Sequence, residues 1–294
     1  MCGIIGYVGG RQSPPLLLEG LKKLEYRGYD SSGLGVISSD HKLLLRKTNG
    51  KIRNLEELLV TQPLPESFIG ISHTRWATHG APNRVNAHPH ADCHGKILVV
   101  HNGIIENYEI LKELLQDKGH KFVSETDTEV IAHLIEANYT KDLLSAVQKT
   151  IKFLKGAFAI GVISIDHPDV LIAARVGSPL IIGVGKGENF IASDVPAILE
   201  HTRKIIYLKD GQLAAIRKNS VQIYNFSGQS VKPKIDHVNF KIDAVQKQGY
   251  AHFMLKEIHE QPEGLRQMLH SRIKGNTVHL EGWNIADKIG RAHV

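Results

Sequence analysis

The 294-residue sequence is poor in cysteine, with only Cys2 and Cys93. Two cysteines cannot form a disulfide framework, and neither belongs to a Cys-x-x-Cys pair, so a disulfide-stapled secreted domain is excluded. No apolar run approaches the roughly 20 residues that span a bilayer, and the N-terminus lacks a basic segment followed by an apolar one. We therefore expect a cytoplasmic protein with no membrane partner.

A strong excess of one charge is also lacking. The 36 Lys and Arg residues against 30 Asp and Glu give a net charge of +6, and no basic cluster rich in aromatic residues accompanies it. Nucleic acid is therefore not an expected partner. A hydrophobic fraction of 42% and a charged fraction of 22% are typical of a soluble globular protein.

The N-terminal half mixes short apolar strands with amphipathic helices. Residues 2–10 form an apolar run typical of a buried strand, and Ser13 before Pro14 predicts the N-cap of a helix. Asn107 predicts the cap of another helix over residues 108–119. Its expected buried stripe consists of Ile110, Leu111, Leu114 and Leu115. Two further helices are expected near residues 126–139 and 141–154.

From residue 156 to residue 226 the pattern changes to closely spaced strands separated by glycine, proline and Asp-Gly turn signals, as expected for antiparallel hairpins. A two-sheet core with helices outside accounts for both halves of the sequence. We predict an α+β fold, a four-layer α/β/β/α sandwich of mostly antiparallel sheets.

The last part of the sequence predicts a change of domain. Residues 2–228 form the predicted first domain, residues 229–248 are polar and lysine-rich like a linker, and residues 249–294 resume a helical pattern interrupted by Pro262. Residues 289–294 match the translation of a common sequencing adapter. We hypothesise that the natural sequence diverges at or near Ile289 and continues.

Cys2 is a candidate nucleophile because of its position. Removal of Met1 would leave a thiol and a free α-amine on one residue, and that amine has an ordinary pKa of roughly 7.7–8.0. Near neutral pH a fraction of it is uncharged and can accept the thiol proton, directly or through a water. A buried strand directly after Cys2 would hold it rigidly; the alternative is an inert cysteine of the core.

Five motifs accompany this cysteine, at residues 26–33, 72–80, 86–90, 101–107 and 124–129. Together with residues 2–9 they resemble the class II glutamine amidotransferases, whose fold is that of the N-terminal nucleophile hydrolases. The motifs YRGYDS and HTRWATHG are similar to those of the hexosamine-forming branch.

The resemblance implies a role for each matching residue. Cys2 attacks glutamine and its own amine is the base, while the Asn102 side chain and the Gly103 N–H form an oxyanion hole. From sequence alone, a tight Asn-Gly turn remains an alternative. The residues implied to bind glutamine or to position the N-terminus are Arg75 (α-carboxylate), Asp127 (α-ammonium), Thr78 and His79 (pocket), Trp76 (closing loop), and Arg27 and Gly28 (N-terminus). Arg75 as a surface residue and Asp127 as a helix cap remain open alternatives.

No metal and no cofactor are expected. His88, His90, Cys93 and His94 lie close in sequence, but their spacing fits no standard zinc motif. Cys93 is interpreted as incidental, and the glycines of residues 183–189 as strand turns rather than a phosphate loop.

The implied partners follow from the family. Glutamine is the substrate of this domain, and residues 249–294 resemble the start of a sugar isomerase domain that would aminate fructose 6-phosphate to glucosamine 6-phosphate, commonly in a homodimer. The sequence as given is expected to act as a glutaminase only. Alternatives are another class II amidotransferase of the purine or asparagine type, or a non-enzymatic regulatory module.

Overall fold

The computed structural model describes residues 2–239, 250, 252–274 and 277–278. The chain divides into two compact units, Met1–Ile242 and Asp243–Val294. In the described residues, no helix combines the length and apolar character needed to cross a membrane.

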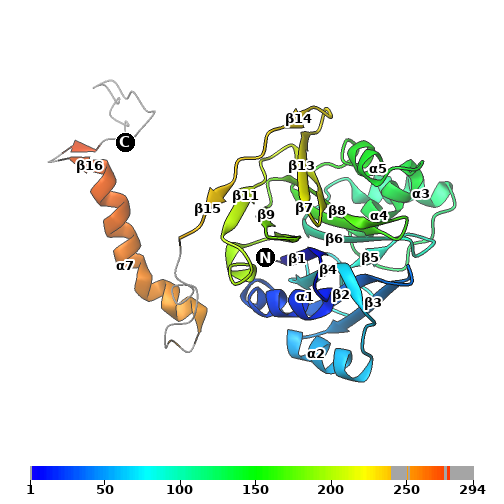
Figure 1. The fold of residues 1–294 in the computed structure, drawn as a ribbon, viewed down its shortest axis with the longest axis horizontal. Coiled ribbons are helices and arrows are strands. Elements are labelled where there is room, and N and C mark those ends of the chain that lie inside the picture. Colours follow the sequence, from blue (N-terminus) through cyan, green and yellow to red (C-terminus); the bar gives the residue numbers. More distant parts are fainter. Residues whose placement is uncertain (1, 240–249, 251, 275–276, 279–294) are drawn as a thin grey trace, which may run out of the picture. The chain divides into compact units, whose positions relative to one another are not determined.

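The first unit is built on two sheets (Figure 1). Sheet A has the order β15-β11-β9-β10-β1-β4-β2-β3. Its strands are β1 (Gly3–Gly9), β2 (Ser31–Ser38), β3 (Leu43–Asn49), β4 (Ser67–Arg75), β9 (Ile181–Val184), β10 (Glu188–Ala192), β11 (Lys204–Tyr207) and β15 (Asp236–His237). Sheet B has the order β14-β13-β12-β8-β7-β6-β5. Its strands are β5 (His90–Ala91), β6 (Ile97–Gly103), β7 (Phe158–Ser164), β8 (His167–Val176), β12 (Gln212–Arg217), β13 (Ser220–Asn225) and β14 (Ser230–Val231).

Helices cover the outer faces of the two sheets. Figure 1 shows α1 (Ser13–Lys22) and α2 (Ile52–Thr61) grouped on one side, and α3 (Tyr108–Asp117), α4 (Glu129–Asn138) and α5 (Leu143–Thr150) on the other. Two short 3₁₀ helices, η1 (Glu25–Arg27) and η2 (Val195–Ala197), complete the unit. The described strand pairs are all antiparallel. The predicted α/β/β/α sandwich is confirmed.

The two sheets enclose one core, and sheet B with its helices encloses a second. Strand β6 shows why its first four residues, 97–100, are apolar. Leu98 and Val100 belong to the core between the sheets, whereas Ile97 and Val99 belong to the core with the helices. Successive side chains point to opposite faces, and both faces are buried, so these four positions are apolar; His101 and Asn102, which follow, are buried but polar.

Strand β1 lies inside sheet A, between β10 and β4, and all seven of its residues are buried. Gly3 pairs with Thr74, and on the other side Ile5 pairs with Ala192. The N-terminal segment is therefore anchored in the middle of the sheet, and Cys2 directly precedes this anchored strand.

The expected stripe of α3 is only half right. Leu111 and Leu115 are buried, but Ile110 is 63% exposed and Leu114 is 54% exposed. Residues four apart share a helix face, so the row of Leu111 and Leu115 faces the buried core and the row one residue earlier points to solvent.

Two predicted helix caps differ from the structure. Ser13 is the first residue of α1, with Gln12 in the cap position, and its hydroxyl lies 2.7 Å from the Ser67 hydroxyl. Asn107 occupies the cap position of α3 but makes no capping bond. Its side chain instead donates to the Phe153 carbonyl and accepts from the Lys155 N–H. These polar side chains bind neighbouring segments in place of their own helix.

The expected linker, residues 229–248, begins inside the first unit. Strands β14 and β15 lie within it and pair with β13 and β11, so the boundary prediction is too early. Residues 240–248 of that linker lie outside the described residues, as does the expected divergence near Ile289. In the second unit, α7 (Phe253–Arg272) runs through Pro262 without interruption, followed by the paired strands β16 (Ile273–Lys274) and β17 (Thr277–Val278).

Candidate active site

Cys2 lies where several of the predicted motifs meet. Its Sγ accepts the Trp76 N–H at 3.2 Å, and its thiol is 3.5 Å from the Trp76 carbonyl oxygen. Its own carbonyl oxygen accepts from Arg27 Nε and from Asn102 Nδ2, each at 3.1 Å. The structure thus brings Cys2 together with three of the residues selected from sequence.

The environment of Cys2 favours the protonated thiol. Burial raises the pKa of the Cys2 thiol, and the Trp76 N–H and the nearby charge of Arg75 offset only part of that effect. A thiolate is the nucleophilic form of cysteine. A base close to the sulfur is therefore required for attack near neutral pH.

The loop after β4 is fixed by the motif at residues 26–33. The Asp30 carboxylate accepts the Ala77 N–H at 2.8 Å, and the Asp30 N–H donates to the Arg75 carbonyl at 3.0 Å. At Gly28, a Cβ atom would lie 2.7 Å from the carbonyl carbon of Arg75, so only glycine permits this close approach of two backbones. This contact gives Gly28 a physical role in placing the loop that holds Cys2.

Arg75 is buried at the end of β4, which excludes the surface alternative. Its guanidinium donates to the carbonyl oxygens of His79, Gly80 and Ala81, the last two at 3.3 Å. Burial lowers its pKa, but a guanidinium stays charged at any physiological pH. In this structure the guanidinium group of Arg75 therefore holds the loop that carries Thr78 and His79 by hydrogen bonds.

The other loop residues are more accessible. Trp76 is 46% exposed, with its ring edge-on to Tyr29 at 5.7 Å between ring centres. Thr78 is exposed and His79 is half-buried, with its ring edge-on to Tyr108 at 5.2 Å. This exposure suits a loop that changes its position when a ligand binds.

Asn102 and Gly103 end strand β6, which pairs with β7 more than 50 residues later. A two-residue Asn-Gly hairpin is therefore excluded. Gly103 has a φ of 130°, and a Cβ there would lie 2.0 Å from the Ala157 carbonyl oxygen. Both the left-handed conformation and the close contact require glycine at this position.

His73 orients the side chain of Asn102 and was missed by the sequence analysis. Its Nε2 lies 3.0 Å from Asn102 Oδ1 and 3.0 Å from the His101 carbonyl oxygen. Because both partners are acceptors, Nε2 carries the hydrogen; burial lowers the pKa of His73 to about 3, so the ring is neutral. The Asn102 oxygen is thereby held at His73, and its NH₂ group turns to Cys2. The available signal was that His73 precedes Arg75 by two residues on the same strand face.

Asp127 joins the motifs at residues 101–107 and 124–129. Its Oδ2 accepts the Ile105 N–H at 2.8 Å, and its Oδ1 lies 3.9 Å from His79 Nδ1. It lies before Thr128, the cap position of α4, whose side chain makes no capping bond. The structure thus places Asp127 between the segment of residues 101–107 and the loop of His79.

Ser193 and Asp194 hold three residues that lie near Cys2, namely Ile4, Tyr26 and Arg27. Asp194 accepts from the Tyr26 hydroxyl at 2.6 Å and pairs with Arg27 at 3.3 Å. Burial and the Asp194 carboxylate raise the pKa of Tyr26 to about 12. The neighbouring Ser193 hydroxyl accepts the Ile4 N–H at 2.9 Å. Asp194 and Ser193 come from a segment with no sequence motif, so only the fold reveals them.

Of the histidines at residues 88–94, His88 and His90 lie apart from Cys93, whereas His94 Nε2 lies 3.4 Å from Oε1 of Glu136, whose other carboxylate oxygen accepts the Cys93 N–H. His88 stacks on His73 at 4.2 Å between ring centres and meets His90 edge-on at 4.9 Å. His88 and His90 are buried, whereas Cys93 is exposed on the turn between β5 and β6. Residues 183–189 form the β9–β10 turn, as their glycines predicted.

Comparison with known proteins gives one consistent result. Residues 73–200 match the family described as the glutamine amidotransferase domain. The chain is 49% identical to glutamine--fructose-6-phosphate aminotransferase [isomerizing] of Clostridium tetani, over 100% of this chain and 49% of that protein. It is 54% identical to the enzyme of the same name from Aquifex aeolicus, over 92% of this chain and 45% of that protein. The chain therefore spans about half the length of these relatives.

Among solved structures, the chain is similar to glutamine phosphoribosylpyrophosphate amidotransferase from B. subtilis in complex with ADP and GMP. The TM-score is 0.66 at 26% identity, covering 76% of this chain and 49% of that one. The identity to the curated relatives is about twice as high.

Proposed function

This chain belongs to the glutamine amidotransferase domain family, and we propose that its first unit hydrolyses glutamine with Cys2 as the nucleophile. The thiolate attacks the side-chain amide carbon, and the amide nitrogen takes a proton and leaves as ammonia. Water then hydrolyses the glutamyl thioester, which releases glutamate and the free thiol.

The observation that carries this proposal is the 3.1 Å contact between Asn102 Nδ2 and the backbone of Cys2. A donor held beside the backbone of Cys2 is suited to receive the oxygen that becomes negative during attack, with the Gly103 N–H as second donor. A fixed donor of this kind contributes about 3 kcal/mol of transition-state stabilisation in other hydrolases.

The proposed base is the α-amine of Cys2 after removal of Met1. It is carried by the same residue as the thiol, whose raised pKa demands a base. The rigid strand β1 and the bond from Arg27 to the Cys2 carbonyl support this role, since both limit the motion of the N-terminal residue.

For glutamine itself, we assign the α-carboxylate to Arg75 and the α-ammonium to Asp127. A guanidinium binds a carboxylate by two parallel hydrogen bonds. Arg75 would exchange the carbonyls of residues 79–81 for the substrate, and Thr78 and His79 would then complete the pocket under Trp76.

Transfer of the ammonia to fructose 6-phosphate, as the names of the relatives state, is proposed only for a longer protein that includes the isomerase part. A homodimer and a cytoplasmic location belong to the same proposal. An amidotransferase of the purine type is less supported, because the similarity to its structure is 26% identity against about half for the curated relatives.

The test is glutamate release from glutamine by the wild type and by Cys2→Ala, at matched thermal stability. We expect a loss of at least 1,000-fold in kcat in the variant, in line with removal of a covalent nucleophile. Equal rates in the two proteins would refute the proposal.

A further inference from the structure

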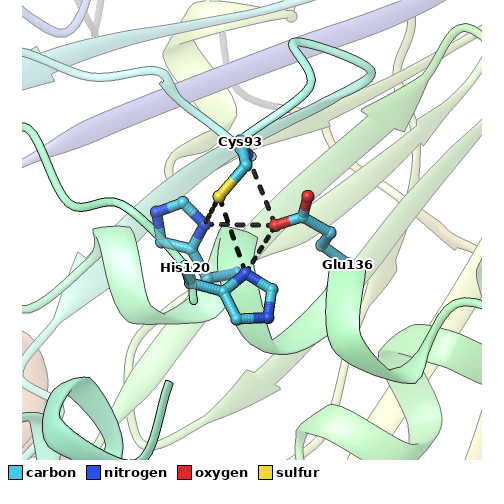
Figure 2. Close-up of side chains that lie close together, drawn as sticks. Cys93, His120 and Glu136 are labelled. Atoms are coloured by element: carbon cyan, nitrogen blue, oxygen red, sulfur yellow. Dashed lines mark hydrogen bonds and ion pairs between the residues drawn. The ribbon is translucent and has the colours of Figure 1, made fainter. Parts of the chain in front are cut away.

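A second cluster of reactive side chains lies away from Cys2, on the outer side of sheet B. Cys93 comes from the β5–β6 turn, His120 follows α3, and His133 and Glu136 lie one turn apart on α4. One ligand atom from each residue lies within 4.8 Å of the others. Figure 2 shows Cys93, His120 and Glu136 pointing toward one another.

We propose that Cys93, His120, His133 and Glu136 bind a zinc ion that ties the β5–β6 turn and the segment after α3 to helix α4. This proposal replaces the expectation of no metal. It is independent of the proposed glutaminase function.

The distances between ligand atoms fit a tetrahedral site. With Zn–S near 2.3 Å and Zn–N near 2.0–2.1 Å, tetrahedral geometry separates sulfur from nitrogen by about 3.6 Å and nitrogen from oxygen by about 3.4 Å. Cys93 Sγ lies 3.6 Å from His120 Nδ1 and 3.4 Å from His133 Nδ1, and His133 Nδ1 lies 3.3 Å from Glu136 Oε2. The 2.8 Å between His120 Nδ1 and Glu136 Oε2 is shorter and would lengthen on binding.

The ligand chemistry favours zinc over the harder ions calcium and magnesium. One thiolate, two neutral imidazoles and one carboxylate form a borderline-soft set, and their two negative charges balance Zn²⁺. Calcium and magnesium prefer sites made only of oxygen atoms.

Local structure holds the ligands in place. Asp92 Oδ1 accepts the N–H groups of Lys96 and Ile97, each at 2.7 Å, which fixes the turn of Cys93. The Lys121 N–H donates to Cys93 Sγ at 3.4 Å. His120 follows Gly119 in a Schellman cap, in which the His120 N–H donates to the Leu115 carbonyl at 3.0 Å.

The carboxylate of Glu129 lies next to the ring nitrogen of His133 that points away from the cluster. Glu129 Oε1 lies 3.5 Å from His133 Nε2, the ring nitrogen opposite the cluster. Glu129 also accepts the N–H groups of Val123 and Ser124, at 2.8 and 2.6 Å. Carboxylates in this position orient metal-binding imidazoles in many zinc proteins. The arrangement links the proposed zinc ion to the start of α4, two residues from Asp127.

The test uses the purified chain, stripped with a chelator and then given Zn²⁺ or Co²⁺. We expect about one zinc per chain by elemental analysis. At a free zinc concentration of about 100 times Kd, the Tm should rise by about 5–10 °C. Bound Co²⁺ should show the visible bands of a tetrahedral site together with a thiolate-to-metal charge-transfer band.

The two cysteines provide the matched comparison. Cys93→Ser should lose the charge-transfer band and weaken zinc binding at least tenfold, and Glu136→Gln should also weaken binding while keeping the band. Cys2→Ser should bind zinc like the wild type, since the chain has no third cysteine. A folded wild type that binds neither ion overturns the proposal, as does loss of the band in Cys2→Ser with retention in Cys93→Ser.

Discussion

The Nε2 atom of His73 lies 3.0 Å from the side-chain oxygen of Asn102. This contact decides which end of the Asn102 amide faces Cys2. A neutral, buried histidine on β4 therefore sets the position of the proposed oxyanion-hole donor on β6.

Replacing Asn102 tests the donor directly. Asn102→Ala should lower kcat for glutamate release by about 100- to 1,000-fold, because one fixed donor to the oxyanion is lost. The nearly isosteric Asn102→Asp, which also lacks the NH₂ group, should fall by a similar factor at a similar Tm. Steady-state kinetics provide the measurement, and full activity in Asn102→Asp would exclude this role.

Gly103→Ala should impair both stability and catalysis. The new Cβ would lie 2.0 Å from the Ala157 carbonyl oxygen, so the end of β6 must shift. Gly211→Ala is the matched control, since Gly211 also has a positive φ, of 74°, but nothing lies within 4 Å of its Cβ position. We expect thermal unfolding to show a larger decrease in Tm for Gly103→Ala, and glutamate release to fall only in that variant. Equal effects would mean that conformational strain alone is responsible.

The buried histidines predict loss of stability in acid. Burial lowers the pKa of His73 to about 3 and holds those of His88, His90 and His101 below their ordinary 6.5. At a pH between the pKa of a histidine in the folded protein and its pKa in the unfolded chain, the unfolded chain binds more protons. The stabilisation is therefore present above pH 6.5 and decreases as pH falls from 6.5 toward 3. Each histidine contributes up to about 1.4 kcal/mol per pH unit in that window.

Urea unfolding at pH 7, 6 and 5 measures this effect. His133 should have the opposite effect on the pH dependence of stability. Burial lowers its pKa, but the carboxylates of Glu129 and Glu136 outweigh burial and raise it. A free energy of unfolding that stays constant from pH 7 to pH 5 would contradict the neutral, buried state of the four histidines.

Helix α3 offers a comparison of two neighbouring apolar residues. Leu111→Ala should reduce the free energy of unfolding by about 2–4 kcal/mol, because Leu111 is buried against the core of sheet B. Ile110→Ala should change it by less than about 0.5 kcal/mol, since Ile110 is largely exposed. Chemical denaturation of both variants checks the orientation of the helix, and a reversed order would mean that α3 is rotated.

Sequence periodicity predicted much of this fold, for identifiable reasons. Strands buried on both faces are largely apolar, as in β6 and β7, where the polar side chains are those of His101, Asn102 and Ser164. Periodicity could not decide whether Leu111 or Ile110 faces the core, because both rows of α3 are apolar. It also could not show that the chain passes from β8 in sheet B to β9 in sheet A, since short turns look alike in either case.

The candidate site was predictable where motifs existed. Cys2, Arg75, Asn102 and Asp127 come from separate motifs, and the fold brings their segments together. Asp194 and the partners of Cys93 could not be found in this way. Cys93 and Glu136 are 43 residues apart and meet only because α4 packs against β5 and β6.

The most direct test of the central claim compares two proteins that both keep the Cys2 thiol. One is the wild type with Met1 removed, verified by intact mass, and the other carries a short N-terminal extension that cannot be cleaved. If the α-amine of Cys2 is the base, the wild type should release glutamate from glutamine and the extended form should lose at least 100-fold in kcat, in line with loss of a general base. Equal kcat in the two proteins, at equal thermal stability, would contradict the account.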